Sequence, residues 1–221
     1  MIIEFCSGCK AALNGQADTD LQAELVDRDF PECACEKISV GSNSPGVVNA
    51  GEYLYRMIIS PGDIDANGVM TLESLRDVGT KGLSVFRECA TDEDITSLII
   101  DRLTRRSTAK PKTVQAVLRV QAGVLQEKMF ELGRLFCIYD ETVPRRNPIL
   151  PMVPTHATML QRLHPPKTEG RKAKNKDGQK TLYDTVRELQ IDLAAFRNGL
   201  IVDLNQRALA GDFILEEDAA A

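Results

Sequence analysis

The chain has 221 residues, of which 43% are hydrophobic and 27% are charged, and its formal net charge is -5. These proportions suit a globular chain that buries a core, and they argue against a disordered protein. The negative charge argues against a protein that coats nucleic acid by bulk electrostatics, because neutralising phosphates needs a surplus of Lys and Arg.

The first residues of the chain, Met1–Cys6, lack the basic region and the long apolar core of a secretory signal. No apolar stretch of the sequence approaches the roughly 20 residues that a membrane-spanning helix needs. We therefore expect a cytoplasmic protein that does not enter a membrane. In that compartment cysteines stay as thiols or bind metal rather than form disulfides.

Residues 1–50 are rich in Cys, Gly, Asp and Asn and show little hydrophobic periodicity, which predicts a small Cys-rich module. Cys6 and Cys9 form a Cys-x-x-Cys pair, and Cys33 and Cys35 form a second pair with a shorter spacer. Four such thiolates would bind one structural zinc ion, whose binding energy would fold a module that has few apolar residues. The alternative is a flexible leader with unrelated thiols, because ordinary zinc pairs have longer spacers than the second pair.

Residues 51–164 are predicted to form a central α+β domain, because stretches with strand character alternate with segments of helical spacing. Thr91, followed by three acidic residues, predicts a capped helix start, since acids there face the positive end of the helix dipole. The stretch 114–125 fits both strand and helix spacing, and we favour a strand. The predicted strands are 52–59, 82–86, 114–125, 135–139 and 157–160, and the predicted helices are 72–78 and 91–105.

Three polar residues of this domain, Arg56, Ser84 and His156, stand in apolar or turn contexts and would together line a cleft; Glu88 is the distant acid that would act with them. An arginine, a strand serine and a distant acid suit a mono-ADP-ribosyltransferase, in which the arginine holds the dinucleotide and the acid stabilises the developing ribosyl cation. The alternative is a surface arginine and a serine at the edge of the core. The sequence contains no phosphate-binding Gly-rich loop, nucleophile elbow or dinucleotide fingerprint, so we favour a protein that is not an enzyme.

Residues 165–181 are predicted to form a basic linker. They begin with two prolines and carry six Lys or Arg residues mixed with Gly, a composition typical of a mobile tether. Alternatively, residues 167–180 would contact nucleic acid, where the cations would bind phosphates without reading sequence.

Residues 182–221 are predicted to form a C-terminal amphipathic helix that ends in an acidic tail. Large apolar residues recur at steps of four and three, which places them on one seam of a helix. The seam consists of Leu182, Val186, Leu189, Leu193, Phe196 and Leu200. Such a stripe must be covered, either by the chain's own core or, because the linker would let the helix swing away, by a protein partner or a second copy of the chain.

The sequence therefore predicts an α+β protein with a small Cys-rich N-terminal module, a central mixed α/β domain and a C-terminal amphipathic helix. We interpret it as a protein-interaction component of a larger bacterial or phage assembly, with a structural zinc module. The alternatives are a small enzyme of the mono-ADP-ribosyltransferase type and a nucleic-acid-binding accessory protein.

Overall fold

The computed structural model describes residues 34–37, 44–79, 82–130, 133–140, 155–161 and 171–215. The predicted zinc ligands Cys6, Cys9 and Cys33 lie outside these ranges. Cys35 belongs to the short helix η1 (Ala34–Lys37), but its side chain also lies outside the described part of the chain. The zinc-stapled module of residues 1–50 therefore stays a prediction.

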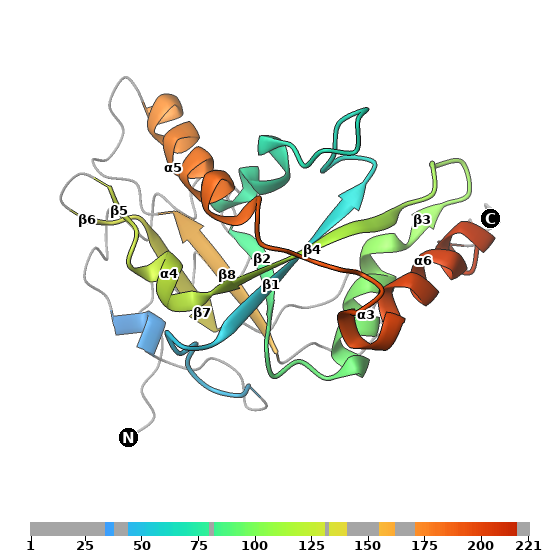
Figure 1. The fold of residues 1–221 in the computed structure, drawn as a ribbon, viewed down its shortest axis with the longest axis horizontal. Coiled ribbons are helices and arrows are strands. Elements are labelled where there is room, and N and C mark those ends of the chain that lie inside the picture. The colour runs from blue at the N-terminus through green and yellow to red at the C-terminus, as the bar shows by residue number, and fades with distance from the viewer. Residues whose placement is uncertain are drawn as a thin grey trace, which may run out of the picture.

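A six-stranded antiparallel sheet forms the centre of the molecule (Figure 1). The strand order β7-β8-β2-β1-β4-β9 departs from the chain order, so the middle of the sheet joins segments far apart in the sequence. The six strands are β1 (Tyr53–Ser60), β2 (Leu83–Arg87), β4 (Thr113–Gln121), β7 (Phe136–Asp140), β8 (His156–Gln161) and β9 (Gln190–Ile191). The predicted mixture of helices and strands is confirmed.

Helices and two small strand pairs surround this sheet (Figure 1). The helices are η2 (Leu72–Gly79), α3 (Asp92–Leu103), α4 (Ala122–Gln126), α5 (Arg171–Val186), η3 (Phe196–Gly199) and α6 (Leu200–Ala210). The parallel pair is β3 (Arg105–Arg106) with β10 (Ile214–Leu215), and the antiparallel pair is β5 (Met129–Phe130) with β6 (Gly133–Arg134).

The predicted helix start at Thr91 is confirmed as a capping box. The Asp94 N–H donates to Oγ1 of Thr91 (3.1 Å), and the Thr91 N–H donates to a carboxylate oxygen of Asp94 (3.2 Å). The ambiguous stretch 114–125 divides, because β4 ends at Gln121 and α4 follows it. The prediction of one strand was therefore right for its first part only.

The two faces of the sheet carry two separate cores. On β1, Leu54 and Ile58 face the first core, which η2, α4 and α5 cover. Tyr55 and Met57 face the second core, which α3, η3 and α6 cover. This alternation is the period-two geometry of a strand buried on both faces.

A C-terminal helix is present as predicted, namely α6, but it is shorter than predicted, because the chain is not one continuous helix after residue 182. Residues 182–215 contain the end of α5, the edge strand β9, the left-handed turn of η3 and then α6. Arg197 and Asn198 have positive φ values of 49° and 55°, and Gly199 continues the left-handed turn with 83°. The break has a physical cause: α5 packs on one face of the sheet and α6 on the other, so the chain must cross the sheet edge between them.

The predicted partner-binding seam is consequently directed inward and is split between the two cores. Leu182 and Val186 are buried in the first core, and Phe196 is buried in the second. Leu193 and Leu200 are partly buried against the second core, whereas Leu189 is 39% exposed. The six residues therefore do not form one docking stripe.

The prediction of a basic linker over 165–181 is also corrected, since α5 already begins at Arg171. Gln179 of this helix donates to the carbonyl of Leu72 (2.6 Å), and the Tyr183 hydroxyl donates to the carbonyl of Met70 (3.0 Å). These bonds fix α5 beside η2. Because the C-terminal residues supply β9 and two helices to the same sheet, residues 182–215 do not form a tethered unit.

Asn205 explains how α6 is held at the sheet edge. Its side-chain amide accepts the Val114 N–H (2.8 Å) and donates to the Val114 carbonyl (2.7 Å), as a neighbouring strand would.

Within the described ranges, no helix has the length and apolar character that a membrane span requires.

Candidate functional site

Three of the four candidate catalytic residues come together on adjacent strands. Ser84 Oγ of β2 lies 2.5 Å from Nε2 of His156 on β8, and Nη1 of Arg56 on β1 donates to the Ser84 carbonyl (2.9 Å). Glu88 is separate: it follows β2, is exposed, and accepts the backbone N–H of Tyr53 (3.2 Å). The structure thus assembles the polar cluster without its proposed acid.

The Arg56 side chain bridges a gap between β1 and β2. These strands pair only at Leu54 with Arg87 and Tyr55 with Phe86, whereas β1 pairs with β4 along its whole length. Beyond the second pair, the Arg56 guanidinium bonds the carbonyl of Ser84 and, through Nη2, the carbonyl of Ser74 in η2 (3.3 Å). The Arg56 side chain therefore connects β1 to β2 where the two strands form no backbone pairs.

The sheet separates the arginine from the serine hydroxyl. Strand alternation places Arg56 on the face of the first core, with Leu54 on the same side. Ser84 shares its face with Phe86, which belongs to the second core, and His156 pairs directly with Phe86. A ligand that reached the Arg56 guanidinium from the first-core side would meet the backbone of Ser84 and not its hydroxyl.

Burial lowers the pKa of Arg56 but does not remove its charge. Loss of hydration lowers the pKa of Arg56 to about 10; Arg102 adds to the decrease, while Asp63 and Asp77 oppose it. The guanidinium remains a cation at neutral pH. Its buried Nε has no hydrogen-bond partner in the described part of the chain.

The cavity beside Arg56 is too small for a substrate. Its volume is about 10 Å³, and apolar side chains such as Leu75, Leu182 and Val186 line it. A space of this size holds at most about one water molecule. A dinucleotide has no room there.

The Ser84–His156 pair is partly enclosed. His156 is 1% exposed, and Ser84 is half-buried. A buried imidazole needs hydrogen-bond partners whether or not it catalyses a reaction, and the Ser84 hydroxyl supplies one.

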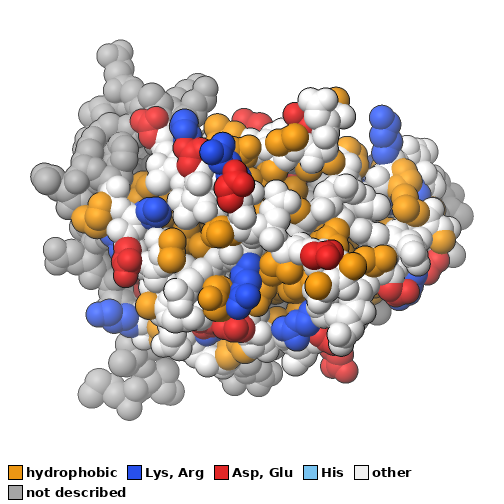
Figure 2. Space-filling view, in the orientation of Figure 1, with side chains coloured by type: hydrophobic (Ala, Val, Ile, Leu, Met, Phe, Trp, Pro, Cys, Tyr) orange, Lys and Arg blue, Asp and Glu red, His pale blue; other side chains and the backbone are white. Residues whose placement is uncertain are grey.

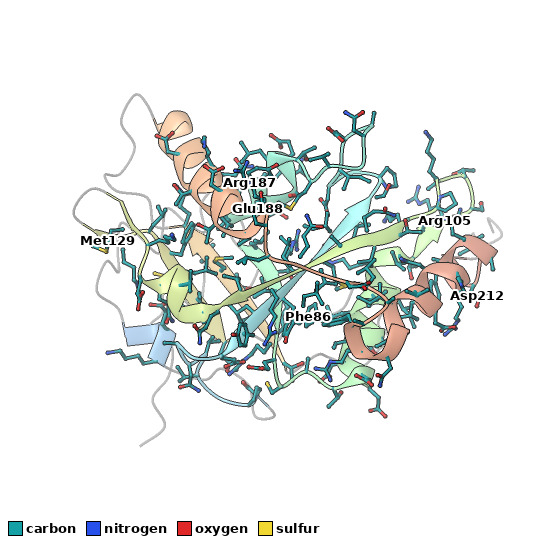
Figure 3. All side chains as sticks on the ribbon, in the orientation of Figure 1. Phe86, Arg105, Met129, Arg187, Glu188 and Asp212 are labelled. Atoms are coloured by element: carbon teal, nitrogen blue, oxygen red, sulfur yellow. The ribbon has the colours of Figure 1, made fainter. Side chains whose placement is uncertain are left out.

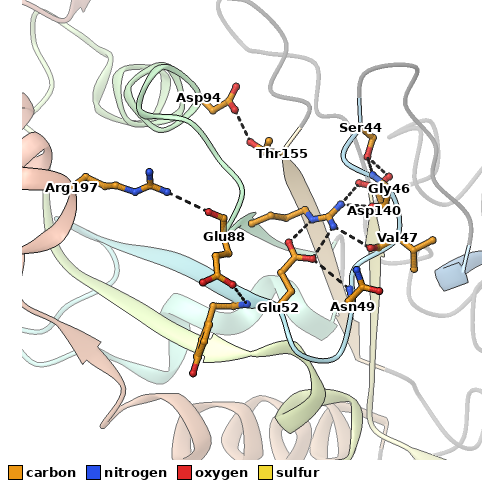
Figure 4. Close-up of polar contacts among 12 residues, drawn as sticks. Ser44, Gly46, Val47, Asn49, Glu52, Glu88, Asp94, Asp140, Thr155 and Arg197 are labelled. Carbon is orange, nitrogen blue, oxygen red and sulfur yellow. Dashed lines mark hydrogen bonds and ion pairs between the residues drawn. The ribbon is translucent and has the colours of Figure 1, made fainter.

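A buried charge network that the sequence interpretation missed surrounds Arg87 (Figure 4). Nε and Nη2 donate to the two carboxylate oxygens of Glu52 (2.7 and 2.8 Å), and Nη1 donates to Asp140 (2.9 Å). Nη1 and Nη2 also donate to the carbonyls of Gly46 and Val47. All five N–H donors are used, so the network attaches residues 44–52 to the sheet.

Charge pairing keeps Arg87 protonated, and its hydrogen bonds leave no N–H donor for a ligand. Burial alone would lower the pKa of Arg87, but hydrogen bonding and charge pairing with Glu52, assisted by Asp140, raise it above its ordinary value. A saturated guanidinium of this kind is a structural anchor. The available signal was the position of Arg87, two residues after the buried Val85 on one strand face.

Cys89 is not an activated thiol, and no metal cluster occurs among the described residues. Cys89 is exposed, and partial burial raises the pKa of its thiol, with Arg87 opposing this effect. Thiol chemistry needs the opposite shift, because the thiolate is the nucleophile. The part of the chain that the structure describes contains no group of three His, Cys, Asp or Glu residues that could hold a metal ion.

The most accessible apolar side chains lie on the outer face of α6 and on β10. Val202 is 37% exposed and Leu209 is 62% exposed; seven residues apart, they share one side of the helix. Ile214 of β10 is 38% exposed. Figure 2 shows hydrophobic, basic and acidic side chains at the end of the molecule where α6 and β3 lie.

Basic residues lie next to Ile214, because β10 pairs with β3. Arg106 of β3 and Lys110 of the loop after it are exposed, and Figure 3 shows Arg105 at the same end of the molecule as Asp212, which follows α6. No carboxylate of the described residues forms an ion pair with the cations of this loop. The α6–β3 surface is defined as Val202, Leu209, Ile214, Arg105, Arg106, Lys110 and Lys112.

None of the protein-family models, curated protein sequences or solved structures compared with the chain gives a match.

Proposed function

We propose that this chain is a non-enzymatic protein-interaction component that docks on its partner through the α6–β3 surface. The observation that carries the proposal is the juxtaposition of exposed apolar side chains with cations that have no carboxylate partner among the described residues. Apolar groups next to fixed charge are typical of surfaces that bind another protein.

The outer face of α6 is not needed to attach the helix to the sheet. Ile201, Leu204 and Ala208 already bury the inner face in the second core, and Asn205 adds the hydrogen bonds to β4. Leu209 therefore contributes little to folding while it exposes an apolar side chain to water. Burying Leu209 against a partner would remove this unfavourable exposure.

The small cavity at Arg56 further supports a role in binding rather than catalysis. As part of the same proposal, the partner belongs to a larger bacterial or phage assembly, and Cys6, Cys9, Cys33 and Cys35 hold a structural zinc ion. Metal analysis of the purified full chain tests the zinc ion. We expect one zinc per chain, lost in Cys6→Ser; a metal-free chain would remove this part of the proposal.

The experiment for the interaction is affinity capture from the native host with the tagged full chain and two variants. Leu209→Glu places a charge on the α6–β3 surface, and Val124→Glu places one on α4, where Val124 is 39% exposed. We expect an identified, stoichiometric partner that is retained by Val124→Glu and lost by Leu209→Glu. Circular dichroism and the thermal midpoint check that both variants fold. Equal capture by both variants would contradict the proposal.

The alternative function, transfer of ADP-ribose, has less support, because the Arg56 guanidinium bonds the carbonyls of Ser84 and Ser74. Incubation of the full chain with labelled NAD and a protein extract tests it. We expect no transferred label. Label transfer that disappears in Arg56→Lys would contradict a purely structural role for the arginine.

A further inference from the structure

We infer that the α6–β3 surface recognises an acidic amphipathic protein segment, in which large apolar side chains on one helical face are flanked by Asp or Glu. The inference rests on the proposed function above and specifies the chemistry of the partner.

The apolar side chains form a short row. Val202 and Leu209 are two helical turns apart, which corresponds to roughly 10 Å along α6. Gly211 caps the helix, and a Cβ placed on it would lie 3.3 Å from Cδ1 of Ile214, so Ile214 lies against the C-terminal end of α6. A partner helix presents apolar side chains at i, i+3, i+4 and i+7 over the same length.

The β3–β10 pair places the cations at the end of α6. Ile214 pairs with Arg105, and Leu215 pairs with Arg106, so the basic loop starts beside Ile214. From Arg102 to Arg119 the sequence contains six Lys or Arg and no Asp or Glu. A partner segment that lies on the apolar row therefore meets positive charge at one end.

The basic loop is held in shape by its own side chains. Nη1 of Arg105 donates to the carbonyls of Arg106 (3.2 Å), Ser107 (3.1 Å) and Ala109 (2.7 Å). Nζ of Lys112 lies 3.4 Å from the carbonyl of Arg102, at the end of α3. A loop that is already ordered loses less conformational entropy when it binds.

The charges on α6 favour an acidic protein over a nucleic acid. Its outer face exposes Asp203, and Asp212 beyond its end pairs with Arg207 (3.0 Å). These carboxylates would repel a phosphate backbone that ran along the row, and Leu209 gives such a backbone nothing to bind. An acidic amphipathic segment places its apolar face on the row and its acids on the basic loop only.

The test measures fluorescence anisotropy of three labelled probes with the full chain. The first probe is a helical peptide with Leu on one face and Glu on the remaining positions. The second has Lys at every Glu position, and the third is a single-stranded oligonucleotide. We expect the Glu peptide to bind more tightly than the other two, and its affinity to fall as the salt concentration rises.

Matched variants assign the binding to the surface. Leu209→Ala should weaken the Glu peptide by about tenfold. Met129→Ala, which removes a side chain of equal exposure (63% against 62%) at another place, should leave the affinity unchanged. Likewise, Arg106→Glu should abolish the preference for the Glu peptide over the Lys peptide, whereas Arg76→Glu on η2 should retain it.

Two results would overturn the inference. Failure of the Glu peptide to bind at millimolar concentration and low salt would reject the partner chemistry; a host partner still captured through Leu209 would then leave the proposed function intact. Tighter binding of the oligonucleotide, insensitive to Leu209→Ala, would identify a nucleic-acid surface instead. Loss of Leu209-dependent capture from the host would be a separate failure, that of the proposed function itself.

Discussion

Replacing Arg87 by methionine tests the buried charge network most sharply. Methionine retains much of the length of the arginine and removes its charge and all five hydrogen-bond donors. The guanidinium is 2% exposed, and its partners Asp140 and Glu52 are 0% and 12% exposed. The variant therefore leaves two carboxylates buried without their cation and frees the carbonyls of Gly46 and Val47.

The magnitude follows from this burial. Removing one partner of a buried ion pair destabilises a protein by about 3–5 kcal/mol, because the remaining charge keeps its desolvation penalty and loses its attraction. Arg76→Met is the matched control, since Arg76 is 70% exposed and lies 3.7 Å from Asp77. An exposed pair of this kind contributes less than about 1 kcal/mol.

Urea denaturation followed by circular dichroism gives the free energy of unfolding of both variants and the wild type. We expect Arg87→Met to lose several times more stability than Arg76→Met. Adding Asp140→Asn to Arg87→Met should recover part of the loss, because it removes one of the uncompensated carboxylates. Equal small losses for the two single variants would refute the assignment of Arg87 as a structural anchor.

Three other predictions concern backbone fit, the sheet edge and thiol chemistry. Gly82→Ala and Gly68→Ala both force alanine to a positive φ, at a cost of about 1–2 kcal/mol. Gly82→Ala should have the lower thermal midpoint, because its new Cβ would also lie 2.3 Å from the Thr158 side chain. Equal midpoints of the two variants would contradict the crowding argument. Asn205→Ala should lower the free energy of unfolding by about 1–3 kcal/mol in a denaturant titration, because the Val114 N–H and the Val114 carbonyl lose their hydrogen bonds to the Asn205 side chain. An unchanged midpoint would disprove the role of Asn205 at the sheet edge. Since its thiol pKa is raised, Cys89 should react with iodoacetamide only at higher pH than a free cysteine peptide; a profile at or below that of the peptide, measured by mass spectrometry, would show an activated thiol.

Five of the six strands of the central sheet could be predicted because their apolar residues are contiguous and bounded by turn residues, whereas the edge strand β9 lies within the segment predicted as the C-terminal helix. The break in the C-terminal region could not be predicted. Apolar residues at steps of four and three between Leu182 and Leu200 fit one continuous helix as well as two helices on opposite faces of a sheet. The deciding feature is the left-handed turn at Arg197–Gly199, whose residue types only weakly indicate a break.

The candidate site was predictable in part for a related reason. Arg56, Ser84 and His156 stand out as polar residues within apolar strands, and the strand order β8-β2-β1 brings them together. Their division between two faces depends on strand register, which local sequence patterns do not specify. The Arg87 network was hidden because its Asp140 partner is 53 residues away in the sequence.

Photo-crosslinking from the helix α6 in the native host tests the interaction claim most directly. A photoreactive amino acid replaces Leu209 in one variant and Met129, which has almost the same exposure, in another. A discrete crosslinked protein from position 209, absent from position 129, is the predicted result. No product from position 209, or the same products from both positions, would contradict a partner docked on the α6–β3 surface.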